Sequence, residues 1–272
     1  MNIAWATDIH LEFLTREERH TFYRSLSEQY PEALLISGDI GTSYRLADFL
    51  QEMAHLALPI YFVLGNHDYY GSSIARVRTA VQKISREEHL HWLPERKIVQ
   101  LTKSTCLIGH GAWADGRYGN YHHSPVLLND YVQIEDFKGL DKEKRLLKLQ
   151  ELGDEAARFA EEMLVRAFQK YRNVIFVTHV PPFREACRHE GEMGNDDWLP
   201  HFSCKAVGDV LQKTMRSHRE CHLTVLCGHT HDWSCSAILP NLIVITGKAE
   251  YGQPEIQGII QPDLLCGNLR GE

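Results

Sequence analysis

The stretch Ile60-Tyr61-Phe62-Val63-Leu64-Gly65-Asn66-His67-Asp68 joins an apolar run, typical of a buried strand, to a glycine and three polar residues. Polar residues likewise follow the strands expected at 2–7, 33–37, 174–178 and 222–227. The five polar groups are Asp8-Ile9-His10, Gly38-Asp39, Gly65-Asn66-His67-Asp68, His179 and Gly228-His229-Thr230-His231. Because ligands in open α/β sheets bind outside the carboxyl ends of the strands, we expect these groups to meet at one edge.

Between these strands the sequence alternates short apolar runs with amphipathic segments, which favours parallel βαβ units and an α/β (α+β) fold. We expect helices at 15–30, 44–58, 72–85, 141–171 and 205–218, with Thr15 and Glu18 in the positions of a capping box. Further strands are expected at 98–102, 105–109, 233–239 and 242–246, the last two joined as a hairpin at Pro240-Asn241. No repeat or linker separates these elements. The sequence therefore predicts a single domain over residues 1–272, with a cap-like insertion around 112–172.

Composition narrows the classes of function. The chain has 272 residues, 29 basic and 36 acidic side chains, and a formal net charge of −7. This acidic balance does not favour a broad grip on phosphate backbones, so a nucleic-acid partner is not expected. The seven cysteines are odd in number and include no C-x-x-C pair, which favours reduced thiols and a cytoplasmic location. We find no secretory signal and no apolar stretch of membrane-spanning length.

The spacing and the residue types of the five groups suit metal binding. Side chains i and i+2 of an extended chain point the same way, so Asp8 can approach one place with His10, and His229 with His231. Carboxylate, imidazole and amide oxygen together suit Mn, Fe or Zn. Asp-x-His alone is a common accident, Gly-Asp alone is usually a turn, and Gly-His-Thr-His alone is moderately specific. All five in order, each after a strand, favour one shared site. So many ligands exceed the needs of one ion and predict two divalent ions with a bridging carboxylate.

In the order D-x-H, G-D, G-N-H-D, H and G-H-x-H, these motifs resemble the calcineurin-like metallophosphoesterase superfamily, from Asp8 to His231. The resemblance implies a sandwich of two mixed β-sheets flanked by helices, in four αββα layers. It also implies that Asp39 bridges the two ions. The first ion would be held by Asp8, His10, Asp39 and His231, and the second by Asp39, Asn66, His179 and His229.

The branch of the superfamily is indicated by the residues around Asp39 and Asp68. Protein phosphatases of this kind have Glu where this chain has Asp68, and an Asp-Arg-Gly triplet after the G-D motif. Here Gly38-Asp39 continues as Ile40-Gly41-Thr42, with no such triplet, which weakens an assignment as a Ser/Thr protein phosphatase. The G-N-H-D form is similar to cyclic-nucleotide phosphodiesterases and broad phosphohydrolases. The segment Asn129-Asp130-Tyr131 also resembles small bacterial members of unassigned substrate.

The resemblance implies hydrolysis of a small or medium phosphoester, by a phosphodiesterase or a phosphomonoesterase. Hydroxide formed from water between the two cations would attack phosphorus in line. His67 would be the general acid for the leaving oxygen, and Asn66 and His67 would hold charge that develops on the phosphoryl oxygens. Asp68 is a third catalytic candidate that could orient His67. Its alternative is a solvated turn carboxylate.

Substrate choice is expected in the inserted segments. Trp113 could stack on a nucleobase, with packing inside its loop as the alternative, and Arg117 could contact a phosphate or simply lie on the surface. His201 could form the opposite wall of the cleft. Two other functions remain as alternatives: a nuclease on the same scaffold, which a basic groove would indicate, and a non-catalytic interaction module, which would be expected to have lost ligands.

Overall fold

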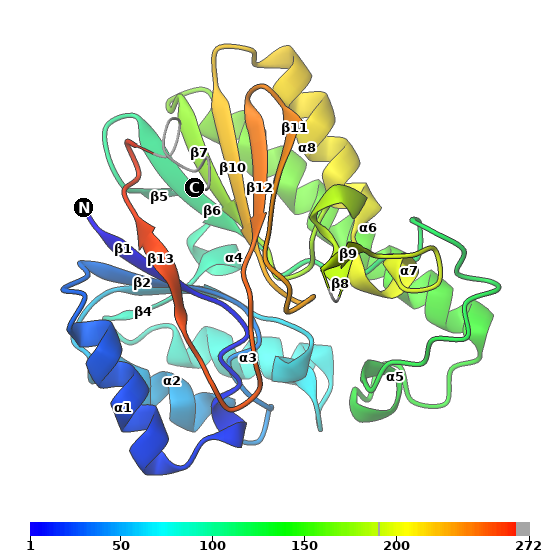
Figure 1. Cartoon of the computed structure of the whole chain (residues 1–272), viewed down its shortest axis with the longest axis horizontal. Coiled ribbons are helices and arrows are strands. Elements are labelled where there is room, and N and C mark those ends of the chain that lie inside the picture. The colour runs from blue at the N-terminus through cyan, green and yellow to red at the C-terminus, as the bar shows by residue number, and fades with distance from the viewer. Residues whose placement is uncertain (190, 265–272) are drawn as a thin grey trace.

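Two mixed β-sheets face each other in the protein, seen here in a computed structural model that describes residues 1–189 and 191–264 (Figure 1). The first sheet has the order β13-β1-β2-β3-β4, and only β13 runs antiparallel to its neighbour. Its strands are β1 (Ile3–Ala6), β2 (Ala33–Ser37), β3 (Ile60–Val63), β4 (Leu90–Trp92) and β13 (Ile256–Ile260).

The second sheet has the order β11-β12-β10-β7-β6-β5, with a parallel centre and an antiparallel strand at each edge. Its strands are β5 (Val99–Gln100), β6 (Thr105–Gly109), β7 (Asn173–Val177), β10 (His222–Cys227), β11 (Ser234–Leu239) and β12 (Leu242–Thr246). A small separate ribbon pairs β8 (Arg188–His189) with β9 (Glu192–Met193).

The two-residue alternation of the strands divides the interior into three apolar layers. Ile3 and Trp5 of β1 pack between the sheets with Ile175 and Val177 of β7. Ala4 and Ala6, on the other face of β1, belong to the layer under the first sheet. The side chains that alternate with Ile175 and Val177 on β7 lie in the layer under the second sheet, so strands buried on both faces read as continuous apolar runs.

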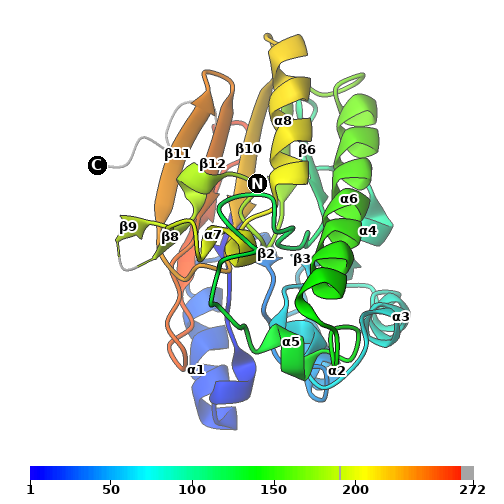
Figure 2. The same cartoon turned by 90° about the vertical axis from the view of Figure 1, so that its right-hand side faces the viewer.

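Helices cover the outer face of each sheet. Helices α1 (Arg16–Ser27), α2 (Leu46–Ala54) and α3 (Ile74–Ile84) pack on the first sheet. Helices α6 (Lys142–Ala167) and α8 (Lys205–Ser217) lie side by side on the second (Figure 2). The short elements are η1 (Leu11–Phe13), η2 (His67–Tyr69), α4 (Leu93–Arg96), α5 (Asp130–Gln133), η3 (Arg184–Ala186) and α7 (Leu199–Phe202).

The predicted four-layer αββα sandwich of two mixed sheets is confirmed, as are the capping box of Thr15 with Glu18 and the hairpin at Pro240-Asn241. The strand expected at 98–102 is shortened to the two residues of β5. Strands β4 and β13 were not expected. Both are edge strands, and β13 contains Gly258 and exposed positions, so neither shows a clear apolar run.

The 112–172 segment consists of a long loop, the short α5 and helix α6, whose apolar stripe packs under the second sheet with Leu211 and Met215 of α8. Among the described residues, none of the helices combines the length and the apolar character needed to cross a bilayer. Cys106, Cys187, Cys204, Cys221 and Cys227 are free thiols, and Cys266 lies outside the described residues.

Candidate metal centre

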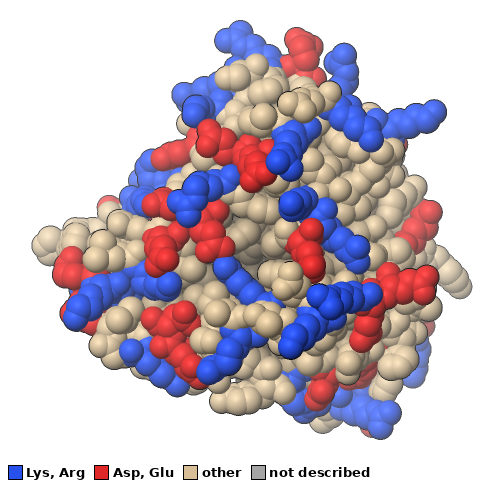
Figure 3. Space-filling model, turned by 180° about the vertical axis from the view of Figure 1, so that it is seen from behind, with Lys and Arg blue, Asp and Glu red and all other residues tan. Residues whose placement is uncertain are grey.

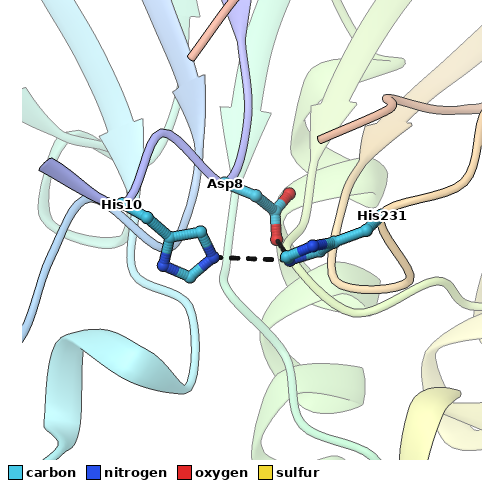
Figure 4. A group of neighbouring side chains, drawn as sticks. All are labelled: Asp8, His10 and His231. Atoms are coloured by element: carbon cyan, nitrogen blue, oxygen red, sulfur yellow. Dashed lines mark hydrogen bonds and ion pairs between the residues drawn. The ribbon is translucent and has the colours of Figure 1, made fainter. Parts of the chain in front are cut away.

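The five polar groups meet at the carboxyl ends of β1, β2, β3, β7 and β10, as the sequence predicted. Figure 4 shows the first group, in which Asp8 and His10 from the segment after β1 face His231 from the loop after β10. His10 Nε2 lies 3.3 Å from His231 Nε2, and Asp8 Oδ1 lies 3.4 Å from the same nitrogen. One carboxylate and two imidazoles thus converge on one point, which fits a divalent transition-metal ion.

The second group adjoins the first through Asp39. Asp39 Oδ2 lies 3.7 Å from His10 Nε2 and 3.4 Å from His179 Nε2. Asn66 Oδ1 lies 2.9 Å from His179 Nε2, so an amide oxygen and an imidazole nitrogen face the same carboxylate. The His229 ring lies beside that of His179, with centroids 5.0 Å apart. The Asp39 carboxylate therefore stands between two sets of donors.

Strained backbone is concentrated at these donors. Asp8, His10, Asp39, His229 and His231 all have positive φ, between 39° and 72°. Each such non-glycine residue costs on the order of 1–3 kcal/mol and persists only where the surroundings fix it. The strain is consistent with donors that are aimed at a bound group.

Glycines leave room for the donor side chains. Gly38 has φ +100°, and a Cβ there would lie 2.6 Å from His179 Nδ1. A Cβ at Gly65 would collide with Asp39, and one at Gly228 would collide with Asp8. Because these contacts involve buried donor side chains, the three motif glycines cannot be replaced without moving the site.

Hydrogen bonds from the backbone hold the donors in place. The His67 N–H donates to Asp39 Oδ1 at 2.9 Å, and the His229 N–H donates to Asp8 Oδ1 at 3.0 Å. His179 Nδ1 lies 3.0 Å from the carbonyl oxygen of Ser37. Because that carbonyl can only accept, Nδ1 carries a proton, and Nε2, which faces Asp39 and Asn66, is the nitrogen that would bind a metal once its own proton is lost.

Burial disfavours charge at the site, but at Asp8, Asp39 and His179 the attraction between opposite charges overcomes it. Despite burial, the charges of His179 and His231 lower the pKa of Asp8 to about 2. Despite burial, His179 and His67 hold the pKa of Asp39 well below its usual range. Conversely, Asp39 and Asp8 overcome burial and raise the pKa of His179 to about 10. Two ionised, buried carboxylates are what a cation would neutralise, and metal binding would release the proton of His179.

Unpartnered polar atoms beside the first group also fit a metal centre. Within the described residues, His10 Nδ1 and both carboxylate oxygens of Glu12 are buried without a hydrogen bond. His10 Nδ1 lies 3.5 Å from Glu12 Oε1, and Glu12 also lies close to His67. In metal sites, the histidine nitrogen that does not contact the metal commonly donates a hydrogen bond to a carboxylate, which orients the ring. Glu12 was not predicted from the sequence, although D-x-H-x-E continues the same two-residue spacing.

A second supporting carboxylate is Asp130 at the start of α5, which the sequence indicated only as part of the Asn129-Asp130-Tyr131 resemblance and not as a site residue. The Asn66 amide nitrogen donates to Asp130 Oδ1 at 2.8 Å, and the Tyr70 hydroxyl donates to the same oxygen at 2.7 Å. Asp130 thereby turns the carbonyl oxygen of Asn66 toward His179. Tyr70 stacks on His67 with a centroid distance of 4.2 Å. Asp130 therefore orients Asn66 directly and His67 through Tyr70.

Asp68 is completely buried, so the alternative of a solvated turn carboxylate is wrong. Its carboxylate accepts the N–H groups of Ile40, Gly41 and Gly65 at 2.8–2.9 Å. Burial and the neighbouring Asp39 raise the pKa of Asp68 to about 8. These contacts join the loops after β2 and β3.

The three substrate candidates lie outside the donor cluster. Trp113 is buried and packs on Tyr69 and Phe137, with centroids 5.5 and 5.6 Å away. Arg117 forms ion pairs with two aspartates, Asp115 and Asp154, at 3.0 and 2.8 Å.

His201, the third candidate, is buried. Its Nε2 lies 3.0 Å from Ser124 Oγ, and burial lowers the pKa of the imidazole to about 4. Its carbonyl oxygen lies 3.3 Å from His229 Nε2, so the backbone at His201, rather than its side chain, faces the site.

The four-layer sandwich with this cluster at its strand ends is the architecture of the metallophosphoesterases. The chain belongs to the calcineurin-like phosphoesterase family, whose sequence pattern matches residues 1–233. The uncharacterized protein L509 of Acanthamoeba polyphaga mimivirus is 23% identical over 267 residues, covering 92% of this chain and 91% of that protein.

Solved structures show the same fold. A dimetal phosphatase from Danio rerio is 13% identical, with a TM-score of 0.60 over 93% of this chain and 89% of that one. The protein TT1561 of Thermus thermophilus is 17% identical, with a TM-score of 0.50 over 91% of this chain and 88% of that one. At these identities the likeness concerns the fold alone.

Proposed function

We propose that this protein is a dinuclear metal-dependent phosphoesterase that hydrolyses a small or medium phosphoester. The observation that carries the proposal is the position of Asp39, whose Oδ2 lies within 3.7 Å of His10 Nε2 and 3.4 Å of His179 Nε2. A carboxylate between two donor sets suits two ions better than one. The Danio rerio protein with the same fold is a dimetal phosphatase, which agrees with this proposal.

In this proposal Asp8, His10, Asp39 and His231 hold one divalent ion, and Asp39, Asn66, His179 and His229 hold the other. Mn, Fe or Zn fits the mixed donors. When bound, such a pair of ions supplies an activated water and neutralises the phosphoryl oxygens.

His67 is the proposed general acid. Its backbone N–H is fixed on Asp39, and its ring is held between Tyr70 and His10 at centroid distances of 4.2 and 4.6 Å. Burial lowers the pKa of His67, although the charge of Asp39 opposes the shift. An imidazolium that parts with its proton readily suits transfer to a leaving oxygen.

Asn66 is proposed as a ligand rather than as a phosphoryl donor. Its amide nitrogen donates to Asp130, and its oxygen faces His179. Asp68 is proposed to act on the site through the loops that it joins, because its carboxylate accepts three backbone N–H groups there.

No observation favours the two alternative functions. A nuclease would be expected to present a basic groove, whereas the formal net charge is −7 and the face in Figure 3 intersperses acidic and basic side chains. A non-catalytic module would be expected to have lost donors, whereas all seven proposed ligands and His67 are present. We retain the cytoplasm as the proposed location, since five of the cysteines are free thiols.

Hydrolysis of p-nitrophenyl phosphate and bis(p-nitrophenyl) phosphate with added Mn²⁺ tests the proposal. We expect turnover of one or both esters, its loss on chelation with EDTA and its return with Mn²⁺. Asp39→Asn is the matched inactive control, because it keeps the size of the side chain but removes the bridging charge. Absence of turnover with Mn²⁺, Fe²⁺ and Zn²⁺ alike would contradict the proposal.

A further inference from the structure

Two exposed aromatic side chains stand together at the rim of the metal centre. Phe13, in η1, is 56% exposed, and Tyr251, in the loop between β12 and β13, is 50% exposed. Their rings meet edge to face, with centroids 5.0 Å apart and planes at 62°. Residues far apart in the chain thus form one aromatic surface, which we call the aromatic rim.

The aromatic rim is continuous with the proposed ligands. The Tyr251 ring lies 4.6 Å from His10 and 4.9 Å from His231, measured between centroids. It lies 6.2 Å from the ring of His67, the proposed general acid. Phe13 lies 6.0 Å from His10. A group attached to a phosphoryl placed between the donor sets would therefore reach the rim.

Both side chains remain accessible to a ligand. Each residue is about half exposed, and the two rings form one contiguous aromatic patch rather than two scattered side chains.

We propose that Phe13 and Tyr251 bind a flat aromatic ring in the organic part of the substrate, which makes this protein selective for phosphoesters that carry such a ring. Nucleotides and aryl phosphates share this chemistry. The inference rests on the proposed function and gives it a substrate class. The aromatic rim thus replaces Trp113, which is buried, as the proposed surface for stacking.

Binding of phenylphosphonate and of propylphosphonate to the Mn²⁺-loaded protein, measured by calorimetry, tests the inference without turnover. We expect phenylphosphonate to bind about tenfold more tightly, which corresponds to about 1.4 kcal/mol. Phe13→Leu and Tyr251→Leu keep apolar bulk but remove the flat ring, and they should abolish this preference while leaving propylphosphonate within about twofold. Tyr30→Leu, which removes an exposed tyrosine beyond the end of α1, is the matched control and should change neither affinity.

Hydrolysis then distinguishes the two sources of the aromatic ring. Adenosine 5′-monophosphate, phenyl phosphate and glycerol 3-phosphate are compared in wild type and in both rim variants, with KM and kcat separated. A rise in KM for only the nucleotide assigns the rim to a nucleobase, and a rise for only phenyl phosphate assigns it to an aryl group.

The inference is overturned if wild type binds both phosphonates equally, or if the rim variants weaken both alike. If glycerol 3-phosphate is hydrolysed while the rim variants leave all preferences unchanged, the inference fails and the proposed function stands. If phenylphosphonate preference depends on the rim but no ester is hydrolysed, the proposed function fails and the binding surface stands.

Discussion

Replacing Asp130 with alanine should loosen one ligand of the metal centre without touching a metal-facing atom. Asp130 Oδ1 accepts hydrogen bonds from the Asn66 amide at 2.8 Å and from the Tyr70 hydroxyl at 2.7 Å. In Asp130→Ala both donors lose their partner. The carbonyl oxygen of Asn66 is then no longer aimed at His179 and at the proposed second ion.

The size of the effect follows from these contacts. An unsatisfied buried donor costs about 1–3 kcal/mol. Asn66 is buried, whereas Tyr70 is partly exposed and can turn to water, so we expect a loss of about 2–3 kcal/mol in the free energy of unfolding. Loss of a residue that hydrogen-bonds to a metal ligand typically weakens metal binding about 10–100-fold.

Asp130→Asn separates geometry from charge. Both hydrogen bonds end on Oδ1, and an asparagine can offer the same oxygen, so only the charge is lost. We expect this variant to lose about 1 kcal/mol, the difference between charged and neutral hydrogen bonds, and to keep metal affinity within about tenfold. Asp209→Ala, which removes an exposed carboxylate of α8, is the matched control.

Chemical denaturation measures the stability of the three variants, and calorimetric titration with Mn²⁺ measures their metal affinity. We expect the Mn²⁺ affinity of the weaker site to fall from wild type to Asp130→Asn and again to Asp130→Ala, and to be the same in Asp209→Ala as in wild type. If Asp130→Ala binds two ions as tightly as wild type, Asp130 does not orient a ligand and the assignment of Asn66 is refuted.

Three other substitutions test the site. Asp39→Asn should reduce bound metal and abolish hydrolysis, because both donor sets share its carboxylate; retention of two ions by elemental analysis would contradict this. His67→Ala should keep both ions and lower kcat about 10²–10⁴-fold, as for loss of a general acid, and loss of metal would contradict the role of His67. Gly38→Ala should lower the free energy of unfolding by at least about 1–2 kcal/mol and weaken Mn²⁺ binding, because φ is +100° and a Cβ would press on His179. Gly139→Ala is the control: its φ is also positive but its surroundings are open, so it should lower stability and leave metal affinity unchanged. Equal metal affinity of the two variants would contradict this prediction.

The donors could be predicted from sequence because each is encoded locally. An apolar run followed at once by Asp8, Asp39, Asn66, His179 or His229 places a polar side chain at the carboxyl end of a strand. The parallel order of the strands then brings these ends together. Only local spacing and one general property of α/β sheets are needed.

The supporting residues could not be predicted in the same way. Asp130 contacts Asn66 across 64 positions, and Tyr251 reaches His10 from a loop whose path no local pattern describes. Glu12 is the exception, since its spacing from His10 was a usable signal. Trp113 was expected to be available for stacking but is buried. The exposure of an aromatic loop residue depends on its neighbours in space, which the local sequence does not specify.

Edge strands were the weakest part of the predicted fold for a related reason. Strands β1 and β7 are covered on both faces and read as apolar runs, whereas β13 is partly exposed and has Gly258 inside it. Its place beside β1 depends on a long-range antiparallel pairing.

Anomalous diffraction from crystals grown with Mn²⁺ shows whether Asp39 bridges two ions. We expect two peaks at the carboxyl ends of β1, β2, β3, β7 and β10, about 3.5–4 Å apart, with the carboxylate of Asp39 in contact with both. A single peak, or two peaks of which only one touches Asp39, would contradict this expectation.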